Sequence, residues 1–122
     1  MKLVEENLNL EFPITTVKIF VTIPVEYVSK VRDAVCKLGA GVIGNYSYCT
    51  YSVLGVGTFI PGENANPFIG NENQLEFVKE EKLEFVCKVN NVKNVVKAIR
   101  EAHPYEEPEI DIFPLIDENF FK

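Results

Sequence analysis

The clearest pattern in the chain is a period of two over residues 17–24, in which four β-branched apolar residues alternate with Lys18, Phe20 and Thr22. Apolar residues hold every second position there, and Pro24 closes the run. A period of two places alternate side chains on opposite faces of a β-strand. The same alternation returns over residues 83–89 and again over residues 110–113, just before a proline. We therefore predict three strands at these positions.

The middle of the chain predicts a fourth strand followed by a long loop. Residues 47–56 are rich in tyrosine, threonine and valine, which suit a pleated surface. Residues 57–74 contain two prolines and four asparagines, together with glycines, so we expect a long loop or an extended hairpin tip. Long loops of this kind are usually functional or interfacial. Residues 75–78 either extend the strand at 83–89 or form a short strand of their own.

Two segments carry apolar residues at helical spacing. Valines and a leucine recur every three to four residues over 25–38, and Gly39 follows as a left-handed C-terminal cap. A second apolar stripe covers residues 91–102, where Asn90 or Asn91 precedes the first turn and Pro104 prevents continuation. We predict one helix in each segment.

The resulting order is β-α-β-β-α-β, which predicts an α+β fold of the ferredoxin-like kind. In this arrangement both helices cover one face of a four-stranded antiparallel sheet. We assign residues 17–116 to this domain, residues 1–16 to an N-terminal extension and residues 117–122 to a C-terminal tail. The second face of the sheet is too apolar for a solvated surface and predicts a homo-oligomer. Its expected apolar members are Phe20, Val86 and either Tyr48 or Tyr51.

Composition narrows the cellular setting and the partners. The 122 residues are 47% hydrophobic and 25% charged, as in one globular domain. A net charge of -6 disfavours nucleic acids and anionic membranes, and no apolar stretch is long enough to span a bilayer. The acidic N-terminus is unlike a signal peptide, and three cysteines give no disulfide framework. We expect a cytoplasmic protein that binds neither nucleic acid nor membrane.

Residue chemistry alone reveals no catalytic constellation. Gly39, Gly41 and Gly44 spell a dinucleotide-binding pattern, but they follow a predicted helix and precede a strand, which is the wrong context. The single histidine, His103, opens the run HPYEEP. Together with Glu106 or Glu107 and Cys49 it offers the ligands of a mixed site for zinc or a similar divalent ion, especially where subunits meet. The residues by themselves favour the alternative, a structural turn stiffened by its two prolines.

Four sequence stretches resemble one known family. They are GAGVIGNYSYCTYS at 39–52, GVGTFIPGENANPFIG at 55–70, LEFVKEEKLEFVC at 75–87 and AHPYEEPEIDIFPL at 102–115. Their order and spacing resemble the inserted domain of the YqfO family, dinuclear-metal-centre proteins also called NGG-one interacting factor three-like. The last stretch is also similar to a motif of CutA, a trimeric relative of PII signalling proteins. The resemblance implies a CutA-like fold.

The resemblance implies a role without the family's metal chemistry. In full-length YqfO proteins a larger domain carries the metal ligands, and the present sequence has no counterpart of it. The resemblance therefore implies a non-enzymatic binding, regulatory or assembly module and a homo-oligomer, with a trimer ahead of a dimer. The alternative is a subunit of a metal-dependent hydrolase completed by a separately encoded partner. The implied ligand-binding residues are Gly44, Asn45, Asn66, Pro67, Phe68 and Tyr105.

We predict the ligand site at the HPYEEP turn, with the GNYSYC turn of a neighbouring subunit as its second wall. Both turns follow a helix, but the strands after them run in opposite directions in a ferredoxin-like sheet. Within one chain the two turns therefore start at opposite ends of the molecule. Only a subunit boundary would bring them together.

Overall fold

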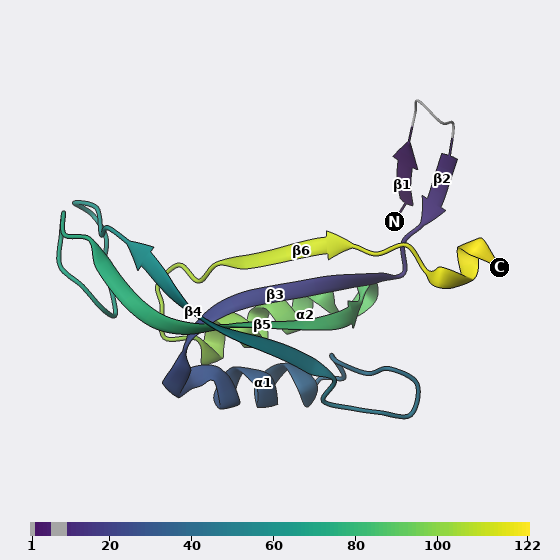
Figure 1. Ribbon diagram of the computed structural model, residues 1–122, viewed down its shortest axis with the longest axis horizontal. Helices are drawn as coiled ribbons and strands as arrows, with labels where there is room; N and C mark the ends of the chain where they lie inside the picture. The colour runs from purple at the N-terminus through teal and green to yellow at the C-terminus, as the bar shows by residue number, and fades with distance from the viewer. Residues whose placement is uncertain (1, 6–9) are drawn as a thin grey trace.

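The fold is a four-stranded antiparallel sheet with two helices on one face (Figure 1). The structure is a computed structural model and describes residues 2–5 and 10–122. The strand order is β4-β5-β3-β6, the ferredoxin-like order. Its strands are β3 (Thr16–Pro24), β4 (Thr50–Phe59), β5 (Glu76–Lys88) and β6 (Ile110–Pro114). The predicted α+β ferredoxin-like class is therefore confirmed.

The helices lie where the apolar stripes predict them. A short 3-10 turn, η1 (Val25–Tyr27), leads into α1 (Val28–Cys36), and η2 (Val89–Asn91) leads into α2 (Val92–Ala102). Gly39 follows α1 with a φ of 92°, the left-handed conformation expected of a C-terminal cap. The side chain of Asn91 donates to the Leu38 carbonyl oxygen at 2.8 Å, which ties the start of α2 to the end of α1.

The core lies between the helices and the inner face of the two central strands. Alternate residues of β3 and β5 point into it, as their period of two requires. Its fully buried side chains include Val17, Ile19, Val21, Ile23, Val31, Val35, Leu83, Phe85, Val95 and Ile99. These residues fix the register of the sheet, because a slip of one position would turn them to the opposite face.

The two ends of the domain lie beside each other (Figure 1). An N-terminal hairpin of β1 (Lys2–Glu5) and β2 (Leu10–Pro13) precedes the sheet, and η3 (Glu118–Phe121) follows it. The ring of Phe12 lies 4.8 Å from that of Phe120, measured between centroids. The Leu115 amide also donates to the Thr16 carbonyl oxygen at 3.1 Å. Both terminal segments therefore contact each other at one end of the sheet.

The boundaries of β4 and β5 differ from those we predicted. β4 starts three residues later than expected, because Tyr48 has a φ of 56° and belongs to a turn. β4 also continues to Phe59, and β5 is a single strand from Glu76 onward. We expected residues 75–78 either to extend this strand or to form a short strand of their own, and residues 76–78 extend it. The charged run at 79–82 lies inside the strand, with Lys79 and Lys82 exposed and Glu80 buried.

The outer halves of β4 and β5 form a projecting arm. We use this name for residues 53–82, comprising the two paired strand halves and the loop at their tip (Figure 1). Val53, Leu54 and Val56 on β4 and Phe77 on β5 are 52%, 65%, 65% and 67% exposed. β4 is also an edge strand over all ten residues, and it contains no charged residue or proline. Such an edge exposes unpaired backbone groups that can pair with another chain.

The sheet face opposite the helices is partly apolar. Phe20 stacks on Phe113 with 5.2 Å between ring centroids, and the Lys82 ammonium lies 3.9 Å from the centre of the Phe20 ring. On β4, Tyr51 pairs with Glu84 of β5 and is 65% exposed on this face. We expected either Tyr48 or Tyr51 on this face. Tyr51 lies on β4 and occupies it, whereas Tyr48 precedes the strand. In the described part of the chain, no helix is long and apolar enough to cross a bilayer.

Candidate binding cavity

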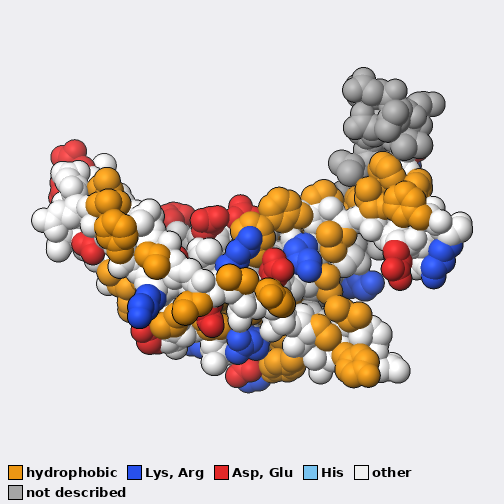
Figure 2. Space-filling model, viewed as in Figure 1, with side chains coloured by type: hydrophobic (Ala, Val, Ile, Leu, Met, Phe, Trp, Pro, Cys, Tyr) orange, Lys and Arg blue, Asp and Glu red, His pale blue; other side chains and the backbone are white. Residues whose placement is uncertain are grey.

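A cavity of about 810 Å³ lies between the arm and the turn after α2. Its volume is in the range of small-molecule sites. Most of its wall is apolar and comes from β4, from the loop at the tip of the arm and from Tyr105. Its charged lining residues are Glu80, Lys82, Glu106, Glu107 and Glu109. Figure 2 shows the hollow between the arm on the left and the body of the molecule, with acidic side chains along it.

The HPYEEP turn is held against the tip of the arm. α2 ends at Ala102 because Pro104 cannot continue it, and Pro108 stiffens the far side of the turn. One carboxylate oxygen of Glu106, Oε1, accepts a hydrogen bond from the Asn66 backbone amide at 3.1 Å. These two residues are forty positions apart in sequence. This contact joins the loop to the turn and encloses one side of the cavity.

Tyr105 places a polar group at the base of the cavity. Its hydroxyl donates to the Glu80 carboxylate oxygen Oε2 at 2.8 Å. Its ring lies edge-on to Phe59, with 5.9 Å between centroids, and 4.9 Å from the His103 ring. Burial, followed by the hydrogen bond and negative charge of Glu80, raises the pKa of Tyr105 well above its ordinary value. The phenol therefore stays a hydrogen-bond donor throughout the neutral range.

Glu80 can occupy its position only because Gly57 faces it. The Glu80 side chain is only 8% exposed, and a Cβ at position 57 would overlap its carboxylate. Tyr105 is the hydrogen-bond partner of the Glu80 oxygen Oε2. Among the described residues no buried side-chain oxygen lacks a partner, so Oε1, to which no side chain or amide of these residues donates, is open to solvent. Oε1 is the carboxylate oxygen that lies nearest to Gly57, which also lines the cavity. The Glu80 carboxylate thus keeps one acceptor oxygen open at the cavity wall.

Both ring nitrogens of His103 are used inside the chain. Nε2 lies 2.8 Å from the Thr22 carbonyl oxygen, and Nδ1 accepts from the Tyr105 amide at 3.1 Å. This pairing requires the tautomer in which Nε2 carries the proton. Burial lowers the pKa of His103 below its ordinary value of 6.5, against smaller opposing effects of the Thr22 bond and Glu80. The ring therefore connects β3 to the turn as a neutral side chain.

A pair of acidic side chains lies at the rim of the cavity. A hydrogen bond with Asp111, burial and the neighbouring negative charges of Asp111 and Glu80 together raise the pKa of Glu109 above its ordinary value. Lys82 opposes this shift only weakly, and its ammonium lies over the Phe20 ring. The cavity therefore carries more negative than positive charge on its wall.

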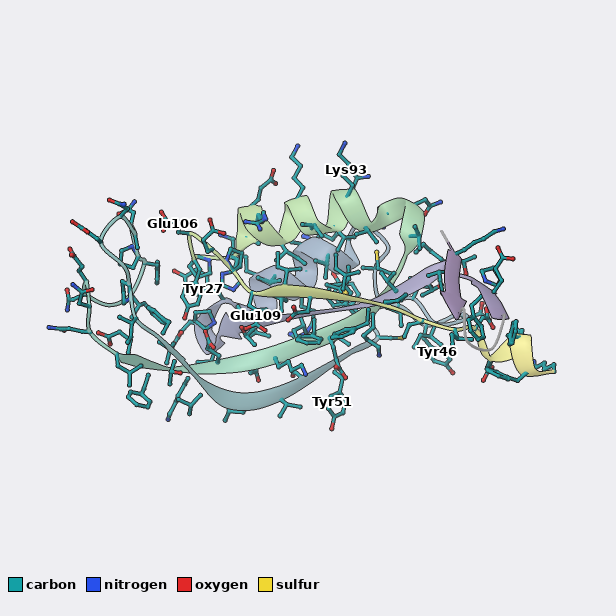
Figure 3. All side chains as sticks on the ribbon, turned by 90° about the horizontal axis from the view of Figure 1, so that it is seen from above. Tyr27, Tyr46, Tyr51, Lys93, Glu106 and Glu109 are labelled. Atoms are coloured by element: carbon teal, nitrogen blue, oxygen red, sulfur yellow. The ribbon has the colours of Figure 1, made fainter. Side chains whose placement is uncertain are left out.

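The GNYSYC turn lies at the opposite end of the molecule. Figure 3 shows Tyr46 of this turn and Glu106 of the HPYEEP turn at the two ends of the sheet. Gly44 adopts a φ of 58°, and the Cys49 thiol lies 3.6 Å from the Tyr46 carbonyl oxygen, within the same turn. This placement agrees with our prediction that the HPYEEP and GNYSYC turns of one chain lie at opposite ends of the molecule.

The structure therefore divides the predicted site residues into three groups. Asn66, Pro67, Phe68, Tyr105 and Glu106 gather around the cavity, and Phe68 packs edge-on against Tyr27 at 5.6 Å. His103 supports the turn from behind. Gly44, Asn45 and Cys49 belong to the turn that contains Tyr46, which lies at the other end of the molecule.

Sequence reasoning missed Gly57, Phe59 and Glu80 as cavity residues. The sequence contained part of the information. Gly55 and Gly57 fall at alternate positions of a strand, so one face of that strand has no side chains there and leaves space for another group. The pairing of Gly55 with Glu80 depends on how β4 and β5 align in the folded sheet, and no local sequence pattern reveals this alignment.

The predicted zinc ligands do not converge within one chain. His103 has both nitrogens engaged, and Cys49 lies in the turn of Tyr46, at the far end of the sheet from Glu106. Within residues 2–5 and 10–122, no three histidine, cysteine, aspartate or glutamate side chains form a metal-binding group. The residues of a single chain therefore do not fit the predicted zinc site. A site shared between subunits stays a prediction.

Comparison with solved structures supports the fold class. CutA1 from Shewanella sp. SIB1 superposes with a TM-score of 0.64 at 16% identity, covering 90% of this chain and 92% of that one. CutA from Xylella fastidiosa gives the same TM-score at 15% identity. The fold is thus that of a CutA-like α+β domain.

Sequence relatives are more specific. The chain is 48% identical over 101 residues to a GTP cyclohydrolase 1 type 2 homolog of Halalkalibacterium halodurans, covering 83% of this chain and 27% of that protein. The Bacillus subtilis protein of the same name is 45% identical over 98 residues. A Bacillus cereus protein related to NIF3 superposes with a TM-score of 0.74 at 40% identity over 85% of this chain and 26% of that one.

Through this segment the chain belongs to the YqfO, or NGG-one interacting factor three-like, family. The chain spans about a quarter of the length of the curated relatives it matches. No family model matches the sequence.

Proposed function

We propose that the chain is a non-enzymatic binding module that takes a small molecule in the cavity beside the HPYEEP turn. The observation that carries this proposal is the way the cavity is built. The arm, its tip and the turn after α2 are distant in sequence, and the Asn66–Glu106 and Tyr105–Glu80 hydrogen bonds hold them together. Such preorganisation lowers the cost of ordering a site when a ligand binds.

A ligand screen read by NMR tests this proposal. Amide resonances of Gly57, Tyr105 and Ala65 report on three walls of the cavity, and those of Gly44 and Asn45 report on the opposite end. We expect at least one metabolite-sized ligand to shift the first group saturably and leave the second group unchanged. A complete absence of such shifts across a diverse screen would contradict a binding role.

We further propose that the module acts in the cytoplasm as a homo-oligomer, with a trimer ahead of a dimer. The uncharged edge strand β4 and the exposed apolar side chains of the arm support association between copies. Light scattering across a concentration series tests this. A mass of 13.8 kDa at every concentration would contradict it.

A second candidate function follows from the names of the relatives. They are called GTP cyclohydrolase 1 type 2 homologs, and about three quarters of their length lies outside the segment matched here. In this alternative the chain is one part of a metal-dependent hydrolase and is completed by a separately encoded partner. Affinity purification from the native cell would recover such a partner in a stoichiometric amount, whereas the binding-module proposal expects only copies of this chain.

Zinc binding by His103, Glu106 and Cys49 remains a proposal that needs two subunits. Because His103 is engaged on both nitrogens, zinc would have to displace either Thr22 or the Tyr105 amide. Calorimetric titration of wild type and Cys49→Ser with zinc tests it. Equal affinity in both would remove Cys49 from the site.

A further inference from the structure

The chemistry of the cavity wall points to the charge of its ligand. Four carboxylates line the cavity, at Glu80, Glu106, Glu107 and Glu109, against the single ammonium of Lys82 among the described residues. Lys82 is already engaged over the Phe20 ring, 3.9 Å from its centre. A phosphorylated or carboxylated ligand would therefore enter a wall of like charge, which costs free energy at short range in a partly apolar site.

Glu80 supplies a specific acceptor and not merely a diffuse charge. The residue is more than nine-tenths buried, its Oε2 is fixed by the Tyr105 hydroxyl, and Oε1 is left open to the cavity, because no buried side-chain oxygen in the described part of the chain lacks a partner. A hydrogen bond from a charged donor to a carboxylate oxygen held in this way is stronger than one between neutral groups. A ligand N–H group at this position would satisfy the free oxygen.

The surroundings of Glu80 favour an organic cation over a metal ion. A hard divalent ion needs several oxygens at short range, and no three suitable ligands converge in residues 2–5 and 10–122. The walls instead offer aliphatic side chains and the rings of Phe59, Phe68 and Tyr105. Aromatic faces stabilise organic cations and bury apolar surface at the same time. The volume of about 810 Å³ leaves room for an apolar body as well as a charged head.

We propose that the cavity binds a small organic cation, an amine or guanidinium carried on an apolar or aromatic body, with its charged head at Glu80. This inference rests on the proposed binding function and adds the class of ligand to it. The head donates to Glu80 Oε1, the body lies against Phe59 and the loop at 65–69, and the remaining carboxylates raise the local concentration of cations.

A matched series of indoles separates charge from shape. Tryptamine carries a cationic head, tryptophol a neutral one and indole-3-acetate an anionic one, on the same aromatic body. Titrations followed by calorimetry and by the amide resonances of Gly57 and Tyr105 measure each affinity. We expect tryptamine to bind about tenfold or more tightly than tryptophol, and indole-3-acetate to bind weakest. Added salt weakens only the tryptamine interaction.

Glu80→Gln is the decisive variant, because its amide oxygen can still accept from the Tyr105 hydroxyl while the negative charge is lost. We expect it to weaken tryptamine about tenfold and to leave tryptophol unchanged. Glu101→Gln removes the same charge from an exposed position on α2, outside the cavity lining, and serves as the matched control. Circular dichroism verifies that both variants are folded.

The outcomes distinguish the ligand class from the binding function. Equal affinity for all three indoles, or tighter binding of indole-3-acetate or GTP at the same resonances, would overturn the cationic class and leave a binding cavity. If no compound of any charge shifts the cavity resonances, the binding function itself is wrong. Loss of tryptamine affinity in Glu101→Gln as large as in Glu80→Gln would reduce the effect to overall charge and also overturn the role of Glu80.

Discussion

The body of the sheet and the projecting arm are built from the same kinds of residue but bury them differently. In the body, Ile19, Val21 and Phe85 are at most 1% exposed beneath the two helices. In the arm, Leu54, Val56 and Phe77 are about two-thirds exposed on the outer part of the β4–β5 ladder. The presence of apolar residues in a strand of this chain therefore does not by itself show that the strand is buried. The body buries its apolar side chains beneath the helices, and the arm leaves much of its own apolar surface exposed.

The largest expected effect separates one phenylalanine in each region. Phe85→Ala should lower the free energy of unfolding by about 3–5 kcal/mol, because it leaves a cavity in a close-packed core. Phe77→Ala, the matched change in the arm, should alter it by only about 0.5 kcal/mol in the isolated chain. Urea denaturation at low protein concentration measures both. Similar losses in the two variants would contradict the division between body and arm.

The junction of the two regions should be sensitive to pH. His103 joins β3 to the HPYEEP turn, and His103→Ala should cost about 1–3 kcal/mol by leaving the Thr22 carbonyl and the Tyr105 amide without partners.

Because burial lowers the pKa of His103, the unfolded chain binds more protons than the folded chain just below pH 6.5. The wild type should therefore lose stability as pH falls from about 6.5 to the lower folded pKa, and His103→Ala should lose less over the same interval. Parallel pH dependences of the two proteins, measured by urea denaturation between pH 7.5 and 5, would show that His103 is not the titrating group.

The edge strand β4 can be tested independently of the core. Tyr51→Lys places a charge on the edge strand β4 at a position that is 65% exposed. We expect it to weaken self-association about tenfold, equivalent to about 1.4 kcal/mol, without changing monomer stability. Analytical ultracentrifugation gives the dissociation constant. Val42→Lys, at an exposed apolar position of a loop, is the control and should associate like the wild type.

The smallest effect is expected at Gly57. Gly57→Ala forces the Glu80 carboxylate away from its position, but that group is at the end of a flexible side chain, so the loss of stability should be about 1 kcal/mol or less. The hydrogen bond to Tyr105 would be broken, and the pKa of Tyr105 should fall toward its ordinary value. Absorbance of the phenolate during alkaline titration measures this. Gly55→Ala, whose Cβ meets no atom within 4 Å, is the matched control.

The sequence predicts the body better than the arm for a physical reason. Strand β3 and helices α1 and α2 each bury one face. Their apolar residues therefore recur with a period of two in the strand and of about 3.6 in the helices. The outer half of β5 contains the charged run at 79–82, in which no apolar residue marks alternate positions, so the sequence left open whether residues 75–78 extend the strand or form a separate one.

The candidate site was predictable only in part. The prolines around Tyr105 and Glu106 mark a rigid turn in the sequence itself. Glu80 looks like any surface glutamate of a charged run, because its burial depends on Gly57 across the ladder and on Tyr105 from another segment. Contacts between distant segments of this kind leave no trace in local periodicity.

The pairing of β3 with β6 has a consequence for how such a unit is used in longer proteins. Val17 lies opposite Pro114, so the chain enters and leaves the sheet on adjacent strands (Figure 1). A unit with neighbouring entry and exit points can be set into a surface loop of a host without separating the two halves of that loop. The same geometry makes it portable for protein engineering: grafted into an unrelated scaffold, it would add its cavity while leaving the fold of the recipient intact.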